Sequence, residues 1–228
     1  MKIIFTIIGL ISAWSAFAQF AIIYDKEGNC NVRSSPEIHN NIIGKLNNGH
    51  FVYILENSGN WTNVNYSKDS KDVNGYVYKD RLILVSSYTN LPMLTKTDSL
   101  VVLGKDGVKI LITIQNFDSG KHAFTFSPER KDQIQLIDNK PYWGTDGGLP
   151  KTEYKSIEVY IGYTSLALPN SALLGLYQVS LDSSQVHYDK KNDTIYIQSM
   201  NSDGAGGYGV IWKVAKGVFK GRYVFSDF

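Results

Sequence analysis

Hydrophobic and polar residues alternate along most of the chain, as they do in strands that bury one face. Two segments show the alternation well, with apolar positions at Val108, Ile110, Ile112 and Ile114 in the first and at Ile157, Val159 and Ile161 in the second. Residues 186–198 and 209–225 each predict a strand, a polar turn and a second strand. No helical periodicity longer than two turns follows residue 18. The pattern predicts an all-β protein.

Five short apolar runs follow one another between residues 22 and 84, separated by turn residues. In order, the segments are N-V-R-S-S-P at 31–36, I-I-G-K-L-N-N-G at 42–49, V-Y-I-L-E at 52–56, G-N-W-T-N-V at 59–64, and G-Y-V at 75–77 with Arg81 and Leu82 after it. Five strands at this spacing predict a small antiparallel barrel.

A change of pattern separates this region from the rest of the chain. Residues 85–92 are polar, contain Pro92 and lack sustained alternation, which is typical of a linker. We therefore expect a barrel at 21–85, a linker at 86–95 and a second antiparallel β sandwich or barrel at 96–228. The second region resembles no family that we recognise.

The ordered segments of residues 21–85 resemble a bacterial SH3 (SH3b) domain. The resemblance implies a targeting module of an exported bacterial protein that recognises cell-wall peptides through a shallow groove. The aromatic candidates for such a groove are Tyr24, Trp61 and Tyr78, with Asn31 or Arg33 at its rim. In the alternative interpretation Trp61 fills the barrel core together with Tyr76, and Tyr24 and Tyr78 are ordinary strand residues.

Two features depart from the family pattern. Cys30 stands where the family needs no cysteine, and we expect it to be a small buried side chain. The polar run 67–74 predicts an exposed hairpin loop that is longer than usual.

The first eighteen residues have the features of a cleavable signal peptide. Lys2 precedes an apolar run, and Ala16-Phe17-Ala18 is a small-x-small cleavage site. The apolar run is shorter than the roughly 20 residues of a membrane span, and no later segment approaches that length. We expect cleavage after Ala18, a periplasmic or secreted protein, and no membrane span once the leader is removed.

Composition narrows the possible chemistry. The chain of 228 residues has a formal net charge of +2, so no strong field would attract nucleic acid. One cysteine excludes an internal disulfide and a multi-cysteine metal site. The four histidines occur singly, and we find no motif for a nucleophile, a metal or a nucleotide. We expect no catalytic residue, metal or cofactor.

Two glycine-rich stretches, 142–150 and 201–209, stand out in the second region. They could be loops that present Trp143 and Tyr208 to a partner, or plain turns in which glycine supplies positive φ. The carboxylates of this region include Asp146, Glu153, Glu158 and Asp203, and nothing in the sequence selects a catalytic pair among them.

Three functions fit these observations. The first is an exported, non-catalytic binding protein whose SH3b-like module engages peptidoglycan or an extended peptide of the cell envelope. The second is a protein-interaction factor, such as an inhibitor or assembly partner of another envelope protein, with contacts through the loops around Trp143 and Tyr208. The third is a glycan hydrolase that uses carboxylates of the second region.

Overall fold

The computed structural model describes residues 19–68 and 71–226, so the leader expected at 1–18 lies outside the described residues. The protein is all-β, as expected, and its described helices are single 3-10 turns. None of the helices in the described ranges is long and apolar enough to cross a membrane. The helical turns are η1 (Lys79–Arg81), η2 (Val85–Ser87), η3 (Ser119–Lys121), η4 (Asn170–Ala172), η5 (Leu181–Ser183) and η6 (Gly204–Gly206).

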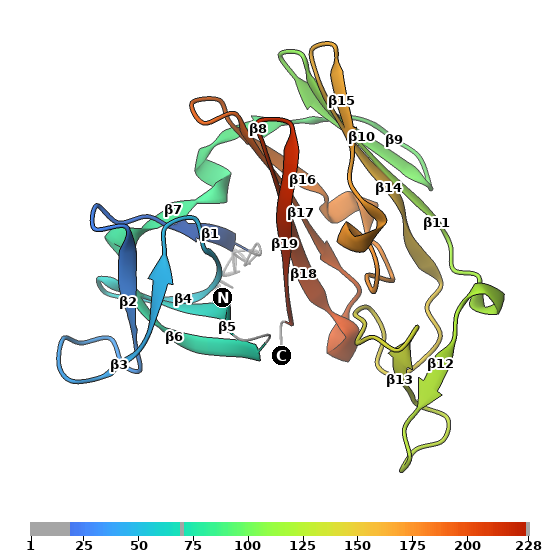
Figure 1. The fold of residues 1–228 in the computed structure, drawn as a ribbon, viewed down its shortest axis with the longest axis horizontal. Helices are drawn as coiled ribbons and strands as arrows, with labels where there is room; N and C mark the ends of the chain where they lie inside the picture. The colour runs from blue at the N-terminus through green and yellow to red at the C-terminus, as the bar shows by residue number, and fades with distance from the viewer. Residues whose placement is uncertain (1–18, 69–70, 227–228) are drawn as a thin grey trace, which may run out of the picture.

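The N-terminal strands form one antiparallel sheet in the order β3-β2-β6-β5-β4-β1-β7, which curls into a half-barrel (Figure 1). Its strands are β1 (Gln19–Ile23), β2 (Asn29–Arg33), β3 (Ile42–Asn47), β4 (Phe51–Ser58), β5 (Trp61–Lys68), β6 (Lys71–Tyr78) and β7 (Leu82–Leu84). The sheet curls around a small core that includes Val32, Val52, Val64 and Val77.

The expectation of a long loop at 67–74 is corrected, because most of these residues belong to two paired strands. Strand β5 continues to Lys68 and β6 begins at Lys71, and Ser67 pairs with Asp72 across the hairpin. Alternation in this stretch is weak because polar side chains occupy both faces of the strands beyond the barrel core. The backbone pairing nevertheless continues to the end of the hairpin.

The remaining strands form two five-stranded antiparallel sheets and a small hairpin. The middle sheet has the order β19-β18-β17-β16-β8, and the outer sheet has the order β15-β14-β11-β10-β9. Their strands are β8 (Thr89–Leu91), β9 (Met93–Lys96), β10 (Leu100–Lys105), β11 (Val108–Asn116), β14 (Thr152–Ile161), β15 (Thr164–Ala167), β16 (Gln185–Asp189), β17 (Thr194–Asn201), β18 (Tyr208–Ala215) and β19 (Val218–Ser226). The hairpin pairs β12 (Phe124–Phe126) with β13 (Ile134–Ile137).

The two five-stranded sheets pack face to face as a sandwich. One apolar core joins Ile110 and Ile157 of the outer sheet to Ile197 and Trp212 of the middle sheet. The stretch 86–95 contains β8 and most of β9, which belong to the middle and the outer sheet respectively. The division of the chain into two domains with a linker at 86–95 stays a prediction.

The opposite face of the middle sheet packs against the half-barrel, so three layers stand side by side (Figure 1). Along β18, Val210 and Trp212 face the sandwich core, whereas Ile211 between them faces the half-barrel. Since successive residues of a strand point to opposite faces, both faces of this strand are buried. The middle sheet therefore carries near-continuous buried runs in place of an alternating pattern.

Candidate functional site

Trp61 and Tyr78 form an aromatic pair on the outer face of the half-barrel. The residues are partners across the β5–β6 ladder, and their ring centroids lie 5.2 Å apart at an interplanar angle of 81°. The neighbouring pair, Thr62 and Val77, is buried. Because side chains alternate between the faces, Trp61 and Tyr78 point away from the core. The alternative that placed Trp61 and Tyr76 in the barrel core is therefore wrong, since both are half-buried on the opposite face.

Arg33 at the end of β2 is held beside this pair. Its guanidinium carbon lies 5.9 Å from the centroid of the Trp61 ring, which is a cation–π contact. Its Nη1 donates hydrogen bonds to the carbonyl oxygen of His39, at 2.9 Å, and to Oδ1 of Asn41, at 2.7 Å. The planar fork of arginine is thus fixed by the loop between β2 and β3.

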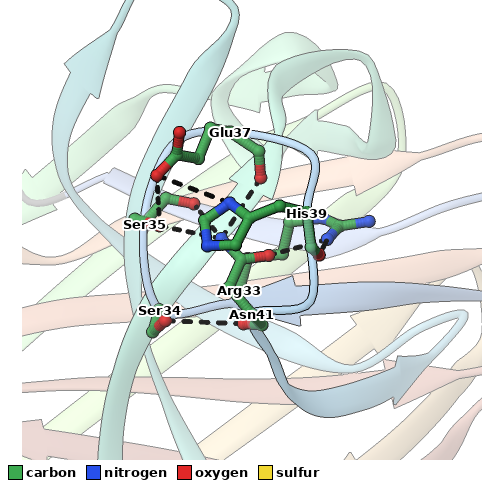
Figure 2. Close-up of polar contacts among 6 residues, drawn as sticks. All are labelled: Arg33, Ser34, Ser35, Glu37, His39 and Asn41. Atoms are coloured by element: carbon green, nitrogen blue, oxygen red, sulfur yellow. Dashed lines mark hydrogen bonds and ion pairs between the residues drawn. The ribbon is translucent and has the colours of Figure 1, made fainter.

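Asn41 organises that loop, as Figure 2 shows. Its Nδ2 donates to the carbonyl oxygen of Ser35 at 3.2 Å, to Oγ of Ser35 at 2.8 Å and to the carbonyl oxygen of Glu37 at 3.2 Å. Asn41 is buried although the residues around it are largely exposed. One buried amide therefore orders the loop and positions Arg33.

These side chains surround a hollow of about 400 Å³. The residues that line it include Asn31, Arg33, Ile38, Lys45, Trp61 and Tyr78. The candidates Asn31, Arg33, Trp61 and Tyr78 thus meet at one site, although their role in binding stays a prediction. The remaining candidate, Tyr24, is 56% exposed and does not line the hollow.

The rim of the hollow carries charges of both signs. Asp25 is buried and bonded to Arg81 Nη1 at 2.9 Å, and its Oδ1 accepts from the backbone of Glu27 at 2.7 Å. Asp80 also contacts Arg81, whereas the exposed side chains of Glu27 and Lys45 have no described ion-pair partner among residues 19–68 and 71–226. The hollow therefore offers an aromatic wall with free charges of both signs near it.

Cys30 lines the same hollow but is not suited to nucleophilic chemistry. The residue is buried, as expected. Burial raises the pKa of its thiol to about 11, and the negative charge of Asp25 adds to this effect. Since the thiolate is the reactive form, the side chain stays a neutral thiol near pH 7.

The second-region candidates occupy different environments. Trp143 is half-buried and packs against the sandwich core, with its ring centroid 6.3 Å from that of Tyr208. The expectation of an exposed loop at Tyr208 is corrected, because this residue begins β18, is fully buried and donates a hydrogen bond to the carbonyl oxygen of Tyr177 at 2.9 Å. Its hydroxyl satisfies a buried backbone carbonyl and offers no surface to a partner.

A polar cluster around His122 was not found from the sequence. His122 Nδ1 lies 2.7 Å from Asp138 Oδ2, and its Nε2 lies 3.7 Å from Glu153 Oε2. The ring stacks on Phe117 with centroids 4.5 Å apart. These residues come from separate elements, so no motif connects them. In the described part of the chain no group of three or more His, Cys, Asp or Glu side chains could hold a metal ion.

Glu153 and Glu158 also make local contacts. Oε1 of Glu153 accepts from Gln115 at 2.8 Å, and Oε2 of Glu158 accepts from the hydroxyl of Tyr160 at 2.7 Å. Glu153 and Glu158 thus bond to different neighbours on the outer sheet.

Comparison with known proteins identifies the half-barrel. A family model described as bacterial SH3 domain matches residues 28–83, and the rest of the chain matches no family model. No curated protein and no solved structure gives a significant match. The matched range contains the segments that form β2 to β6 and most of the lining of the hollow. Residues 28–83 are a bacterial SH3 domain, which is a binding module.

Proposed function

We propose that the protein is an exported, non-catalytic binding protein whose bacterial SH3 domain engages peptidoglycan or an extended peptide of the cell envelope. The observation that supports this most is the hollow formed by Arg33, Trp61 and Tyr78 on the bacterial SH3 domain. Export is proposed from the leader-like residues 1–18.

The chemistry of the hollow suits a short peptide. The Trp61 and Tyr78 rings offer apolar faces to an extended chain, and they need little reorganisation because each ring has few rotatable bonds. Arg33 can pair with a carboxylate through its remaining donors, since only Nη1 is used by the loop. The exposed carboxylate of Glu27 can receive an amino group. Peptides of the cell wall offer carboxylate and amino groups of this kind.

Sedimentation with purified cell-wall sacculi tests the proposal. We expect the wild-type protein to pellet with the sacculi at low salt, and Trp61→Ala to bind at least about tenfold more weakly, because an aromatic residue at the centre of a site contributes about 2 kcal/mol or more. Tyr163→Ala is the matched control, since this fully exposed tyrosine lies in the turn between β14 and β15, outside the half-barrel.

Two results would contradict the proposal. The first is wild-type protein that remains in the supernatant with every peptidoglycan preparation. The second is equal binding by the Trp61→Ala and Tyr163→Ala variants. Capture of a single stoichiometric protein from an envelope extract, without wall binding, would favour the protein-interaction alternative instead.

A further inference from the structure

A second hollow lies where the bacterial SH3 domain meets the middle sheet. It measures about 460 Å³ and is lined on the barrel side by the turn at Gly49, His50 and Phe51. On the other side the lining comes from β18 and β19 and includes Lys213 and Lys220. These segments are about 160 residues apart in sequence and meet only because the half-barrel packs on the middle sheet.

Two ammonium groups line this second hollow without an anionic partner. Among the described residues, Lys213 and Lys220 take part in none of the ion pairs or side-chain hydrogen bonds, and no carboxylate lines the hollow. Asp72, on the strand beside Ser67, is engaged by a backbone hydrogen bond from Ser226. Lys213 is half-buried, and Lys220 is exposed.

Lys213 and Lys220 lie beside a β-bulge in the β18–β19 ladder. Lys213 pairs with Gly221 and Val214 pairs with Phe219, which leaves Lys220 as the extra residue of a β-bulge. Bulges of this kind redirect a side chain and are common next to binding sites. On the barrel side, a Cβ atom at Gly49 would lie 3.7 Å from Nζ of Lys213, so this ammonium lies directly over the turn.

Arg222 also lines the hollow, but its guanidinium donates hydrogen bonds to the carbonyl oxygens of Ala172 and Leu174. The other lining residues are neutral or aromatic. Burial lowers the pKa of His50, so its ring is neutral near pH 7. The ring donates a hydrogen bond to the backbone of Ser67. Ser67 itself lines the hollow and supplies a hydroxyl group, and Phe51 and Tyr223 form aromatic parts of the wall. Two compact cations and a hydroxyl donor match a group with several acceptor oxygens and close to two negative charges.

We propose that this second hollow binds a phosphate-bearing ligand through Lys213 and Lys220. The site is separate from the hollow around Trp61 and includes residues of both the bacterial SH3 domain and the sandwich. A ligand here would therefore contact both layers at once and would stabilise their association by mass action.

Isothermal titration calorimetry of the full chain tests the site with three probes at matched ionic strength. The probes are inorganic phosphate, glycerol 3-phosphate and vesicles that contain phosphatidylglycerol. We expect saturable binding of phosphate or glycerol 3-phosphate, and at least about a tenfold loss of affinity in the Lys213→Gln, Lys220→Gln double variant, because hydrogen bonds to charged groups contribute more than neutral ones. Lysine-dependent binding to vesicles alone would identify the phosphate of a lipid headgroup as the ligand.

The matched control is the Lys151→Gln, Lys155→Gln double variant, which removes the same charge from exposed positions in or beside β14. It should bind like the wild type. A second measurement uses the wild type only. The probe that binds should shift the ring proton signals of His50 in an NMR titration and leave those of His122, in the second region, unchanged. The proposal is overturned if none of the probes binds, if both double variants lose affinity equally, or if a probe that binds leaves the His50 signals unmoved.

Discussion

Replacing Phe225 by alanine would test the contact between the half-barrel and the middle sheet. Phe225 on β19 is fully buried and stacks on Tyr53 of the half-barrel, with ring centroids 3.6 Å apart. It also meets the edge of Phe20 at 5.4 Å. The neighbouring Gly209 leaves space for the ring, since a Cβ atom at that position would overlap it. The Phe225 ring is therefore enclosed by Tyr53, Phe20 and Gly209.

The expected cost follows from this burial. A buried Phe→Ala substitution destabilises a protein by about 3–5 kcal/mol, through lost transfer free energy and the cavity that is left. For a chain of this size, 1 kcal/mol corresponds to roughly 2–4 °C in Tm. We therefore expect Tm of the Phe225→Ala variant to fall by roughly 6–20 °C in differential scanning calorimetry.

Phe126→Ala is the control for this experiment, because Phe126 is 48% exposed on β12, far from the half-barrel in Figure 1. It should lower Tm by no more than about 3 °C, since exposed apolar side chains contribute little to stability. A fall of less than about 2 °C in Phe225→Ala would show that the half-barrel and the middle sheet are not packed as described.

Two further predictions concern buried titratable groups. Cys30 should react with iodoacetamide at pH 8 at least about a hundredfold more slowly in the native protein than in urea, because a pKa near 11 leaves little thiolate; rates within tenfold of each other would contradict this. Burial lowers the pKa of His187, so the unfolded state takes up more protons below about pH 6.5 and the free energy of unfolding should fall as the pH drops from 7 to 5. Urea titrations should show a shallower fall of this free energy for His187→Gln than for the wild type. The control is His39→Gln, which changes an exposed histidine and should behave like the wild type. The same pH dependence in all three proteins would refute the role of His187.

Local pattern was sufficient to predict most of the strands. The alternation at Val108, Ile110 and Ile112 is confirmed by the burial of these three residues, and Ile157 and Val159 are buried in the same core. The segments that resemble a bacterial SH3 domain also gave the correct architecture for the half-barrel, because its turns and strand lengths are encoded within a few residues of each other.

Contacts between distant segments could not be predicted in this way. Tyr208 follows a glycine-rich stretch that resembles a loop, and only the packing of the sandwich reveals that its side chain is buried. His122 meets Asp138 and Glu153 through tertiary structure alone. A single sequence predicts a contact between distant residues only when those residues form a motif of known spacing. His122, Asp138 and Glu153 form no such motif.

Because both faces of the middle sheet are buried, the bacterial SH3 domain cannot move independently of the sandwich. A module tethered by a free linker searches for its ligand independently of its companion. Here Phe20 and Tyr53 are covered by Ile211 and Phe225, so the module is one wall of a larger body. A force exerted by an anchored ligand on the hollow around Trp61 would be transmitted through this contact into the sandwich. The orientation of the sandwich relative to that ligand would thereby be fixed.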